Sequence, residues 1–518
     1  MKKIKVFALL ATLFVGIFSN LFTPVVSADT SNATVTIHKL QGKTGPIVNT
    51  GKKLSGFTAS DFLDGITYNV YDVTAAYHTK YNEVYTSTTA QNADNKAREY
   101  VQGTAGHAPT VSGATRVGTP QVTANGGVAT FTLPKTSNGK DAVYVFVEQP
   151  KTGIAKAENN LVLSFPVYEL NSDGSYTDKE LTDIHLYPKN TTEEIEPVKD
   201  ITNPNPDTDG RNNYNIGQDI EFKLSTKIPA NIGVKEVDGV TPHYNTFGLI
   251  DTHDTTLTFN PAGTHELKVA GTTTVLTEGE TADYTIVVGE PAVEGKDTFK
   301  VKLTQAGINK LATHGGQTLE FTYKMKLKDT AKIDEANINK VTVEYGRKEG
   351  EFSDVVTTPG NEKEVYTGGY RFIKTDVSTD KPLANAEFVV RDADAPTAKY
   401  LKIDDTTKEI SWVKSVTDAT IFKTGEDGIV DIKGLTYGTY YLEETKAPTD
   451  YVKLTKRIGF DVKFDSYKTT TTTPHRVANT PKGFLPSTGG AGIILFVALG
   501  AAMVGLAGVY FTSRRKDA

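Results

Sequence analysis

Two stretches of the chain share one order of short segments in which apolar and polar residues alternate, and this pattern constrains the fold most strongly. A period of two is typical of β-strands with one buried face. Each stretch has an opening segment, a segment ending in Asp, one led by Gly, one of the form Tyr-x-apolar-x-Glu, and a closing segment that carries Asn. These segments are 34–39, 68–72, 127–131, 144–148 and 184–190, and then 370–374, 388–392, 428–432, 440–444 and 477–479. The pattern predicts an all-β fold of tandem immunoglobulin-like β-sandwiches.

The regions between these segments predict a few helices and linkers. Residues 90–98 are expected to form a surface helix in the first stretch, and 304–312 and 331–336 are expected to form short helical turns. Residues 191–194 and 352–367 are expected to be linkers.

Strand alternation sends a Lys, a Glu and an Asn to the apolar face in each stretch. The residues are Lys39, Glu148 and Asn190 in the first, and Lys374, Glu444 and Asn479 in the second. For a single residue, a snorkelling Lys or a Glu at the sheet rim would be the simpler interpretation. Unpaired buried charges are costly, and the same trio occurs twice in the same order, so a shared function is favoured.

An internal isopeptide bond is the chemistry that such a trio predicts. Burial disfavours the charged forms, so the amine becomes nucleophilic and the acid is expected to stay protonated. The acid can then shuttle protons while the Lys Nζ attacks the Asn carboxamide and ammonia leaves. The product ties the first strand to the last and restricts the unfolded chain, as a disulfide across a long loop does.

Both ends of the chain carry export signals. A basic start, an apolar run over 6–18 and the small residues Val26-Ser27-Ala28 predict a signal peptide over 1–28. An apolar stretch over 491–511, followed by Arg514-Arg515-Lys516, is long enough to span a bilayer. The chain has no cysteine, so an exported protein here lacks the usual covalent staple, which the isopeptide bonds would replace.

The segment Leu485-Pro486-Ser487-Thr488-Gly489 directly precedes the predicted span. A span alone would predict an ordinary tail anchor, but this combination resembles the cell-wall sorting signal of Gram-positive surface proteins. The resemblance implies that a sortase cleaves between Thr488 and Gly489 and passes the threonyl group to an amine.

Composition and motifs argue against several other functions. A net charge of −6 and the lack of a basic stripe disfavour nucleic acid as a partner. The sequence has no catalytic nucleophile–base motif and no phosphate-binding glycine loop, so neither an enzyme nor a cofactor is predicted, and a secreted hydrolase is disfavoured. Residues 205–210 resemble the start of a calcium loop, but Ile216 stands where the closing Glu is expected. A polar turn without a metal is the preferred interpretation.

Two further motifs resemble those of sortase-assembled, streptococcal-like backbone (major) pilins. Residues 440–451 are similar to the pilin E-box, with Asp450 where the family usually has Gly. Tyr187-Pro188-Lys189-Asn190 is similar to the core of the pilin motif, with Ile184 and Leu186 where the family often has Trp and Val. The resemblance implies immunoglobulin-like domains of the collagen-adhesin A and B types, autocatalytic Lys–Asn isopeptides, and a shaft built by a pilus-specific sortase.

The same resemblance supplies a third trio and the link between subunits. A-type domains of related pilins use a Lys, an Asp and an Asn in this order, which implies Lys199, Asp251 and Asn339, with Asn337 as the competitor. Alternation directs Asn190 into the core and Lys189 to solvent beside His185 and Tyr187. The resemblance implies that Thr488 of one subunit is joined to Lys189 of the next.

The predicted organisation is a signal peptide (1–28), a B-type domain (29–190), an A-type domain (191–360), a B-type domain (361–483) and the sorting segment (484–518). The chain is expected to be secreted, anchored in the cell wall and assembled into a pilus. Expected partners are a pilus-specific and a housekeeping sortase, other copies of the chain, ancillary pilins, peptidoglycan and a host surface ligand. A monomeric wall-anchored adhesin and a minor pilin are the alternatives.

Overall fold

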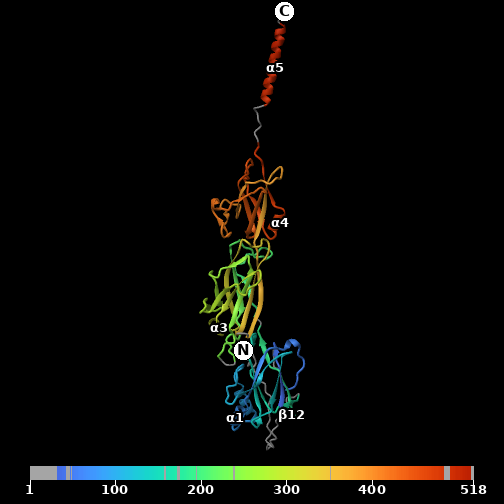
Figure 1. Ribbon diagram of the computed structural model, residues 1–518, viewed down its shortest axis with the longest axis vertical. Coiled ribbons are helices and arrows are strands. Elements are labelled where there is room, and N and C mark those ends of the chain that lie inside the picture. The colour runs from blue at the N-terminus through green and yellow to red at the C-terminus, as the bar shows by residue number, and fades with distance from the viewer. Residues whose placement is uncertain are drawn as a thin grey trace, which may run out of the picture. The chain divides into compact units, whose positions relative to one another are not determined.

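The computed structural model describes residues 32–42, 47, 49–156, 159–171, 175–193, 195–236, 240–349, 352–483 and 491–514. The chain divides into two compact units. Figure 1 shows their strands coloured by position in the chain. The first unit holds the residues up to 212 together with 218–331 and 336–365, and the second holds 213–217, 332–335 and the residues from 366 onward. The predicted signal peptide and the predicted sorting signal 485–489 lie outside the described residues. The boundary at residue 190 between two domains stays a prediction.

The amino-terminal part of the first unit is a β-sandwich. Strand β1 (Asn32–His38) pairs in parallel with β13 (Asp183–Leu186) and antiparallel with β5 (Val128–Pro134). The second sheet has the order β10 (Leu161–Ser164), β8 (Val143–Glu148), β3 (Thr67–Asp72) and β4 (Thr115–Val122). Val35 and Ile37 of the first sheet share one buried core with Tyr68 and Phe146 of the second. The remaining elements are β2 (Leu40–Gln41), β6 (Thr136–Ser137), β7 (Lys140–Asp141), β9 (Ile154–Lys156), β11 (Tyr168–Leu170), β12 (Tyr176–Glu180), β14 (Lys189–Thr192) and the 3-10 turn η1 (Ala59–Asp61).

Two helices cover the outer face of this second sheet. The helix expected over 90–98 is present as α2 (Ala90–Gln102), and α1 (Thr74–Tyr85) precedes it without having been predicted. Val143, Val145 and Val147 of β8 pack against the helices, while Tyr144 and Phe146 of the same strand face the sandwich core. The unbroken apolar run of β8 is therefore explained by burial on both faces.

The rest of the first unit contains two larger sheets whose aromatic side chains meet, for example Phe299 and Phe321 with ring centroids 6.2 Å apart. One sheet has the order β15 (Val198–Ile201), β16 (Asp219–Lys227), β23 (Thr318–Leu327), β19 (Glu266–Val269) and β20 (Val275–Leu276), with β18 (Leu257–Phe259) beside β23. The other has the order β21 (Tyr284–Val288), β22 (Lys296–Leu303), β17 (Thr246–Asp254), β24 (Asn337–Glu349) and β25 (Phe352–Val365). Helix α3 (Gln305–Leu311) and the 3-10 turn η2 (Ala312–His314) agree with the helical turn predicted over 304–312.

Three local predictions were wrong. The expected linker over 352–367 is mostly β25, an edge strand whose register shifts opposite Lys340 and Thr342. Pro359 lies at this shift, and the strand continues through it because proline is tolerated at an edge or a bulge. Residues 191 and 192 of the other expected linker belong to β14 and pair with β9. Residues 331–336 contain a turn but no helix.

The second unit repeats the strand order of the amino-terminal sandwich. Strand β26 (Gly368–Asp376) pairs in parallel with β34 (His475–Asn479) and antiparallel with β31 (Ile429–Leu435), as β1 does with β13 and β5. The second sheet contains β29 (Ile410–Val413), β28 (Tyr400–Ile403), β27 (Glu387–Arg391), β32 (Gly438–Lys446) and β33 (Ile458–Val462), with β30 (Phe422–Lys423) beside β27. Helix α4 (Ser466–Thr472) and the 3-10 turn η3 (Val416–Asp418) complete the unit. The prediction of tandem β-sandwiches is confirmed.

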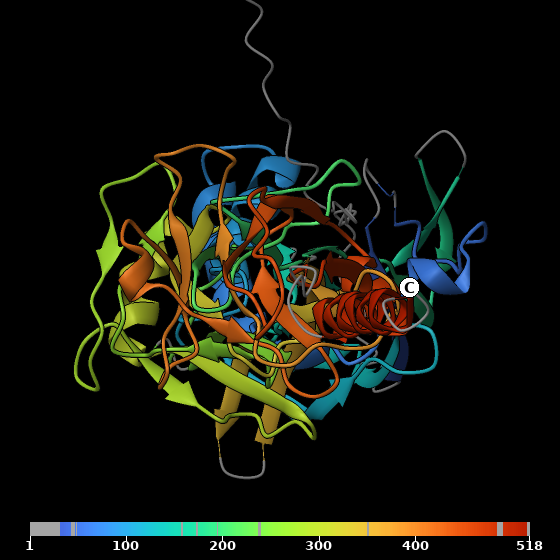
Figure 2. The same ribbon diagram turned by 90° about the horizontal axis from the view of Figure 1, so that it is seen from above.

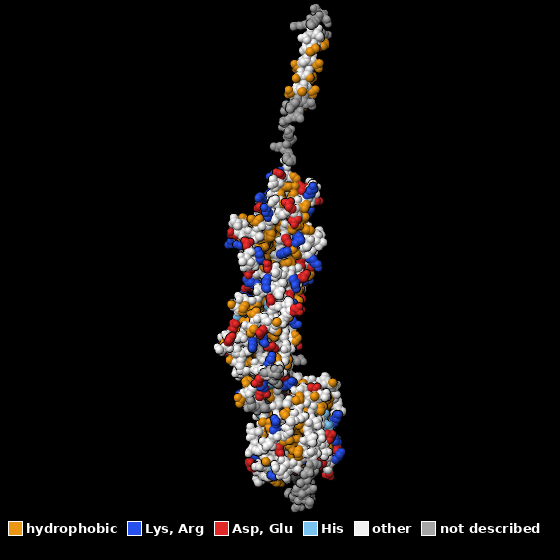
Figure 3. Space-filling model, viewed as in Figure 1, with side chains coloured by type: hydrophobic (Ala, Val, Ile, Leu, Met, Phe, Trp, Pro, Cys, Tyr) orange, Lys and Arg blue, Asp and Glu red, His pale blue; other side chains and the backbone are white. Residues whose placement is uncertain are grey.

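Helix α5 (Ala491–Arg514) corresponds to the predicted span. Its segment Phe496–Ser513 is long and apolar enough to cross a membrane. Figure 2 shows α5 nearly end-on as one coil, and Figure 3 shows apolar side chains along its surface. Phe496, Val504 and Phe511 are at least 70% exposed, which suits a helix surrounded by lipid.

Candidate functional site

Lys39, Glu148 and Asn190 meet inside the amino-terminal sandwich. Lys39 directly follows β1, Glu148 ends β8 and Asn190 lies in β14. The Nζ of Lys39 lies 2.6 Å from Oε2 of Glu148 and 2.6 Å from Oδ1 of Asn190. Asn190 Nδ2 donates to Oε1 of Glu148, and the Tyr68 hydroxyl donates to Oε2 at 3.2 Å. All three residues of the trio are at most 5% exposed, so the carboxylate bridges the amine and the amide away from water.

The second unit brings Lys374, Glu444 and Asn479 together in the same way. The Nζ of Lys374 lies 2.5 Å from Oδ1 of Asn479, and Nδ2 of Asn479 donates to both oxygens of Glu444, at 2.9 and 3.2 Å. Lys374 Nζ is 3.9 Å from Oε1 of Glu444. The backbone N–H of Leu454 donates to Oε2 of Glu444 at 2.6 Å and holds the carboxylate in position.

Lys199, Asp251 and Asn339 form a third buried trio, in the larger sheets of the first unit. The Nζ of Lys199 lies 2.6 Å from Oδ2 of Asp251 and donates to Oδ1 of Asn339. It also donates to the carbonyl of Lys340 at 3.0 Å. None of the three residues is exposed.

The structure brings Asn339 rather than Asn337 to Lys199. Asn337 is equally buried, but its Oδ1 accepts a hydrogen bond from Thr256 at 2.7 Å and its Nδ2 donates to the carbonyl of Val365 at 3.2 Å. Both side chains share one face of β24, so alternation alone could not separate them.

Tyr323 and His253 also contact Asp251, and neither was singled out from the sequence. The Tyr323 hydroxyl donates to Oδ2 of Asp251, and His253 Nδ1 lies 2.7 Å from Oδ1. The signal available for Tyr323 is the alternation of Phe321, Tyr323 and Met325 in β23, which directs all three inward. That pattern is shared by ordinary core residues, so it does not distinguish a functional tyrosine.

Burial changes the acid–base properties of two of these lysines. Desolvation lowers the pKa of Lys199 to about 8, although the neighbouring Asp251 carboxylate acts in the opposite direction. Desolvation likewise lowers the pKa of Lys374 to about 8, opposed by Glu444. An amine with such a pKa gives up its proton far more readily than an exposed lysine and can then act as a nucleophile.

The carboxyl of Asp251 differs from the expectation that the acid stays protonated. Burial raises the pKa of Asp251, but Lys199 and His253 outweigh burial and hold it below its ordinary value. The resting state is therefore an ion pair. Because water stabilises neither charge, transfer of the proton from Nζ to the carboxylate over 2.6 Å converts it into the neutral pair that can react.

Lys189 lies in β14 opposite Leu40 of β2 and is half-buried, whereas its neighbour Asn190 is buried. The expected exposure of Tyr187 was wrong: its ring is 3% exposed and stacks on His38, with centroids 4.7 Å apart. The cause is a break between β13 and β14 at Tyr187 and Pro188, which interrupts the alternation. Thr488 lies outside the described residues, as does the rest of the predicted sorting signal.

The loop that resembles a calcium site is a polar turn in which Asp207 and Asp209 both pair with Arg211. In the described part of the chain, no cluster of His, Cys, Asp or Glu could hold a metal ion.

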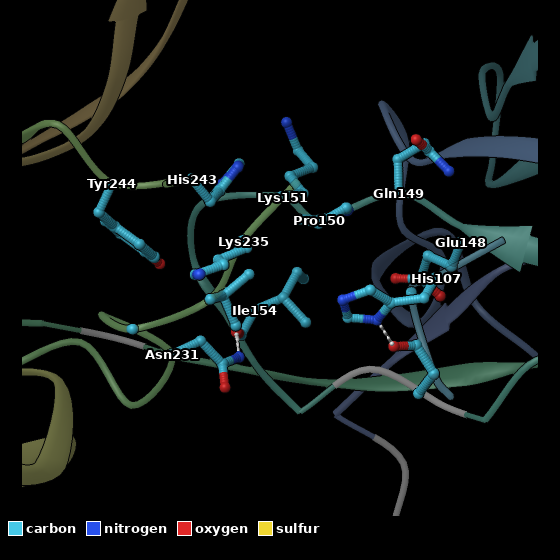
Figure 4. A pocket seen from close by; sticks show the side chains of 14 residues that line it. His107, Glu148, Gln149, Pro150, Lys151, Ile154, Asn231, Lys235, His243 and Tyr244 are labelled. Atoms are coloured by element: carbon cyan, nitrogen blue, oxygen red, sulfur yellow. Dashed lines mark hydrogen bonds between the residues drawn. The ribbon is translucent and has the colours of Figure 1, made fainter. Parts of the chain in front are cut away.

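A cavity of about 470 Å³ lies in the first unit (Figure 4). Its wall includes His107, His243, Lys151 and Lys235. Lys151 pairs with Asp354 at 3.3 Å, and His243 lies 2.6 Å from Glu236. The basic side chains of Lys151 and His243 are thus engaged by carboxylates of the protein.

Comparisons with known families agree with this architecture. Residues 30–191 match the family described as Gram-positive pilin subunit D1, N-terminal domain. Residues 368–475 match SpaA, a prealbumin-like fold domain, and residues 479–518 match the LPXTG cell wall anchor motif. A search of curated proteins found no match.

Solved structures of pilins are similar to the chain. Full-length RrgB pilus protein from Streptococcus pneumoniae is 18% identical over 89% of this chain and 99% of its own, with a TM-score of 0.54. The major pilin SpaD from Corynebacterium diphtheriae is 20% identical over 88% of this chain and 98% of its own, with a TM-score of 0.44. A 35 kDa carboxy-terminal fragment of the major pilin GBS80 of Streptococcus agalactiae is 24% identical over 55% of this chain and 100% of its own, with a TM-score of 0.43.

The matched segments follow the order pilin amino-terminal domain, prealbumin-like domain and cell wall anchor. The likeness to RrgB shows a shared fold over most of both chains. A pilin is a structural protein and not an enzyme. The chain therefore carries a Gram-positive pilin amino-terminal domain over residues 30–191, shares the fold of the RrgB pilus protein, and is anchored to the cell wall through an LPXTG motif.

Proposed function

We propose that the chain is the shaft subunit of a covalent pilus and that three internal isopeptide bonds brace each copy. The bonds join Lys39 to Asn190, Lys199 to Asn339, and Lys374 to Asn479. One observation carries this proposal: a buried lysine amine lies within hydrogen-bond distance of an asparagine carboxamide and beside a carboxyl group at three separate sites.

Each bond forms by the same exchange. A carboxyl group takes a proton from the lysine, the free Nζ attacks Cγ of the asparagine, and the Cγ–Nδ2 bond breaks as ammonia leaves. Glu148, Asp251 and Glu444 act as the acids. No outside reagent is needed, because the reacting groups are already buried together and ammonia is the only product released.

The position of the bonds suits a fibre under tension. Lys374 in β26 and Asn479 in β34 belong to strands that pair in parallel, and they are the first and last strands of their sandwich. Pulling two such strands in opposite directions would shear them apart, and a covalent bond between them bears that load directly. The bonds span 151, 140 and 105 residues along the chain, so unfolding under force could extend little of each sandwich.

For assembly, we propose three domains, over 29–190, 191–360 and 361–483, and a link from Thr488 of one copy to Lys189 of the next. A pilus-specific sortase would form the acyl-enzyme at Thr488, and a housekeeping sortase would join the finished fibre to peptidoglycan. Partial exposure of Lys189 beside the buried Asn190 supports separate roles for these adjacent residues. Ancillary pilins and a host surface ligand are further partners of such a fibre.

Intact mass tests the internal bonds. We expect recombinant protein that covers residues 29–483 to be lighter than the mass of that sequence by three ammonia molecules, about 51 Da in total. Peptide mapping should find each lysine joined to its own asparagine. The Asn190→Ala, Asn339→Ala and Asn479→Ala variants should each be lighter than their own sequence mass by only two ammonia molecules, about 34 Da. A wild-type chain at its full sequence mass would disprove all three bonds.

The lowered pKa of Lys374 predicts a pH dependence in Asn479→Ala, where this lysine stays a free amine. Its pKa is about 8 when folded and near 10.5 when unfolded, so the unfolded chain binds more protons between these values. The free energy of unfolding should therefore rise with pH across this window. Chemical unfolding followed by fluorescence of Trp412, the only tryptophan, measures it in the second unit.

The wild-type chain is the matched control for this titration, because Lys374 no longer titrates once it is part of an amide. The difference between variant and wild type isolates Lys374 from other groups that titrate in the same range. If the difference in the free energy of unfolding between variant and wild type stays constant or falls as the pH rises, the pKa of Lys374 is not lowered in the folded chain.

A further inference from the structure

The three trios differ in how the carboxyl group reaches the leaving nitrogen. In the amino-terminal sandwich, Asn190 Nδ2 donates directly to Glu148. In the second unit, Asn479 Nδ2 donates directly to Glu444, at 2.9 and 3.2 Å. At the Lys199 site, Asn339 Nδ2 donates instead to the Tyr323 hydroxyl at 3.3 Å and to the Met325 sulfur at 3.2 Å.

Tyr323 connects the Asp251 carboxylate to the Asn339 amide. Its hydroxyl donates to Oδ2 of Asp251, the same oxygen that lies 2.6 Å from the Lys199 amine. An unbroken line of hydrogen bonds therefore runs from the nucleophile through Asp251 and Tyr323 to the leaving nitrogen. The difference has a simple cause: aspartate is one methylene shorter than glutamate, and here the carboxylate contacts the amine while the tyrosine hydroxyl contacts the amide.

From this arrangement we propose that Tyr323 is a catalytic residue of the Lys199–Asn339 bond, relaying a proton from Asp251 to the departing Nδ2. This inference rests on the internal isopeptide bonds proposed above and adds a residue that the other two sites do not need.

The proton transfers in this reaction balance. Lys199 first gives one proton to Asp251, and its neutral amine attacks Cγ of Asn339. Asp251 then passes that proton to the Tyr323 oxygen while Tyr323 gives its own to Nδ2, which leaves as ammonia. Nζ, now bonded to Cγ, loses a second proton to Asp251 and keeps one as the amide N–H. Tyr323 ends as it began, Asp251 ends protonated, and the net charge of the site stays the same because the starting ion pair becomes a neutral amide and a neutral acid.

The surroundings keep Tyr323 suited to this role. The side chain is 2% exposed, and its ring stacks on Phe222 with centroids 5.7 Å apart. Burial, together with the Asp251 carboxylate, raises the pKa of the hydroxyl well above its ordinary value, so the hydroxyl stays protonated. His253 Nδ1, 2.7 Å from the other oxygen of Asp251, is a positioning residue that orients the carboxylate.

The test is Tyr323→Phe in the full chain, which removes the hydroxyl but keeps the stacked ring. Chain sampled at intervals after a pulse of synthesis is digested, and the Lys199–Asn339 crosslinked peptide is quantified by mass spectrometry. General acid–base catalysis contributes about 10²–10⁴ in rate, so formation of this bond should slow at least about 100-fold. The Lys39–Asn190 and Lys374–Asn479 bonds in the same molecules should form at the wild-type rate, which also reports that the variant folds.

Tyr284→Phe is the matched control. Tyr284 is a buried tyrosine of β21 in the same pair of sheets, its ring centroid lies 6.5 Å from that of Phe321, and it is not part of the trio, so all three bonds should form normally. A second variant, Asp251→Glu combined with Tyr323→Phe, gives the middle site a longer acid and should restore its bond. If the Tyr323 hydroxyl only supported the structure, the longer side chain of Asp251→Glu would not restore the bond.

The outcomes separate the two proposals. Formation of the Lys199–Asn339 bond in Tyr323→Phe at the wild-type rate, or failure of the longer acid to restore it, overturns the relay and leaves the isopeptide bonds standing. Absence of this crosslinked peptide from the wild-type chain overturns the bond itself, and the relay with it.

Discussion

Replacing Lys189 with alanine is expected to abolish covalent polymers while the monomer is still secreted and anchored. In the proposed assembly the Lys189 amine attacks the acyl-enzyme at Thr488, and no other group on the acceptor subunit performs this step. Head-to-tail joining does not close on itself, so each lost acceptor ends a fibre. Wall extracts boiled in detergent and separated by size should change from a ladder of polymers to monomer alone.

Two control variants sharpen this experiment. Lys189→Arg keeps the positive charge but replaces the amine with a guanidinium that stays protonated, so it should also lack the ladder. Lys179→Ala removes a lysine that is 74% exposed in the same sandwich and should leave the ladder intact. If Lys189→Ala still shows the ladder of polymers, another lysine is the acceptor.

Replacing Glu444 with glutamine is expected to cause a large loss of stability in the second unit. The variant should keep Lys374 and Asn479 in contact but lack the acid that moves protons between them, so about 17 Da of mass should return. The lost bond spans 105 residues. For a loop of this size, the chain-entropy relation gives about 4.7 kcal/mol. A loss of this size lowers the melting temperature of a domain of about 100 residues by roughly 20 °C or more.

Glu443→Gln is the control for Glu444→Gln. Glu443 is the preceding residue of β32 and faces the other way, and its carboxylate pairs with the buried Arg391 at 3.0 Å and with the partly exposed Arg457 at 2.7 Å. Glutamine at this position removes the charge but keeps an oxygen that can accept from both arginines, and it does not touch the trio, so the crosslink should form and the melting temperature should fall less than in Glu444→Gln. Trp412 fluorescence reports both variants in the same unit. Equal melting temperatures for the two variants would mean that the Lys374–Asn479 bond does not brace this sandwich.

The sequence by itself was enough to predict the sandwich fold and two of the trios. Strand alternation is a local property, so it shows which side chains of β8 or β32 face the core without knowledge of the partner strands. A Lys, a Glu and an Asn repeated on the inner face therefore pointed to chemistry before any contact was known. The anchoring span was also evident, because length and apolar composition define such a helix.

Predictions from the sequence were wrong or incomplete where the strand alternation is interrupted and where two candidate residues lie on the same face of a strand. The helix α1, which covers the outer face of β8, was not predicted, and the bulged edge strand β25 was predicted as a linker. The break at Pro188 buried Tyr187, which regular alternation would have exposed. Each of these depends on what packs against a segment, and a neighbour distant in the sequence leaves no periodic signal.

The site around Asp251 shows most clearly which features follow from the sequence and which depend on the tertiary structure. The resemblance of the sequence to related pilins implied Lys199, Asp251 and two candidate asparagines. Only the tertiary structure decided that Asn339 lies at the amine, that Asn337 is held by Thr256, and that Tyr323 stands between the acid and the amide. The physical reason is that periodicity specifies the direction of a side chain, whereas proton transfer depends on ångström-scale distances between strands that are brought together only when the sheets pack.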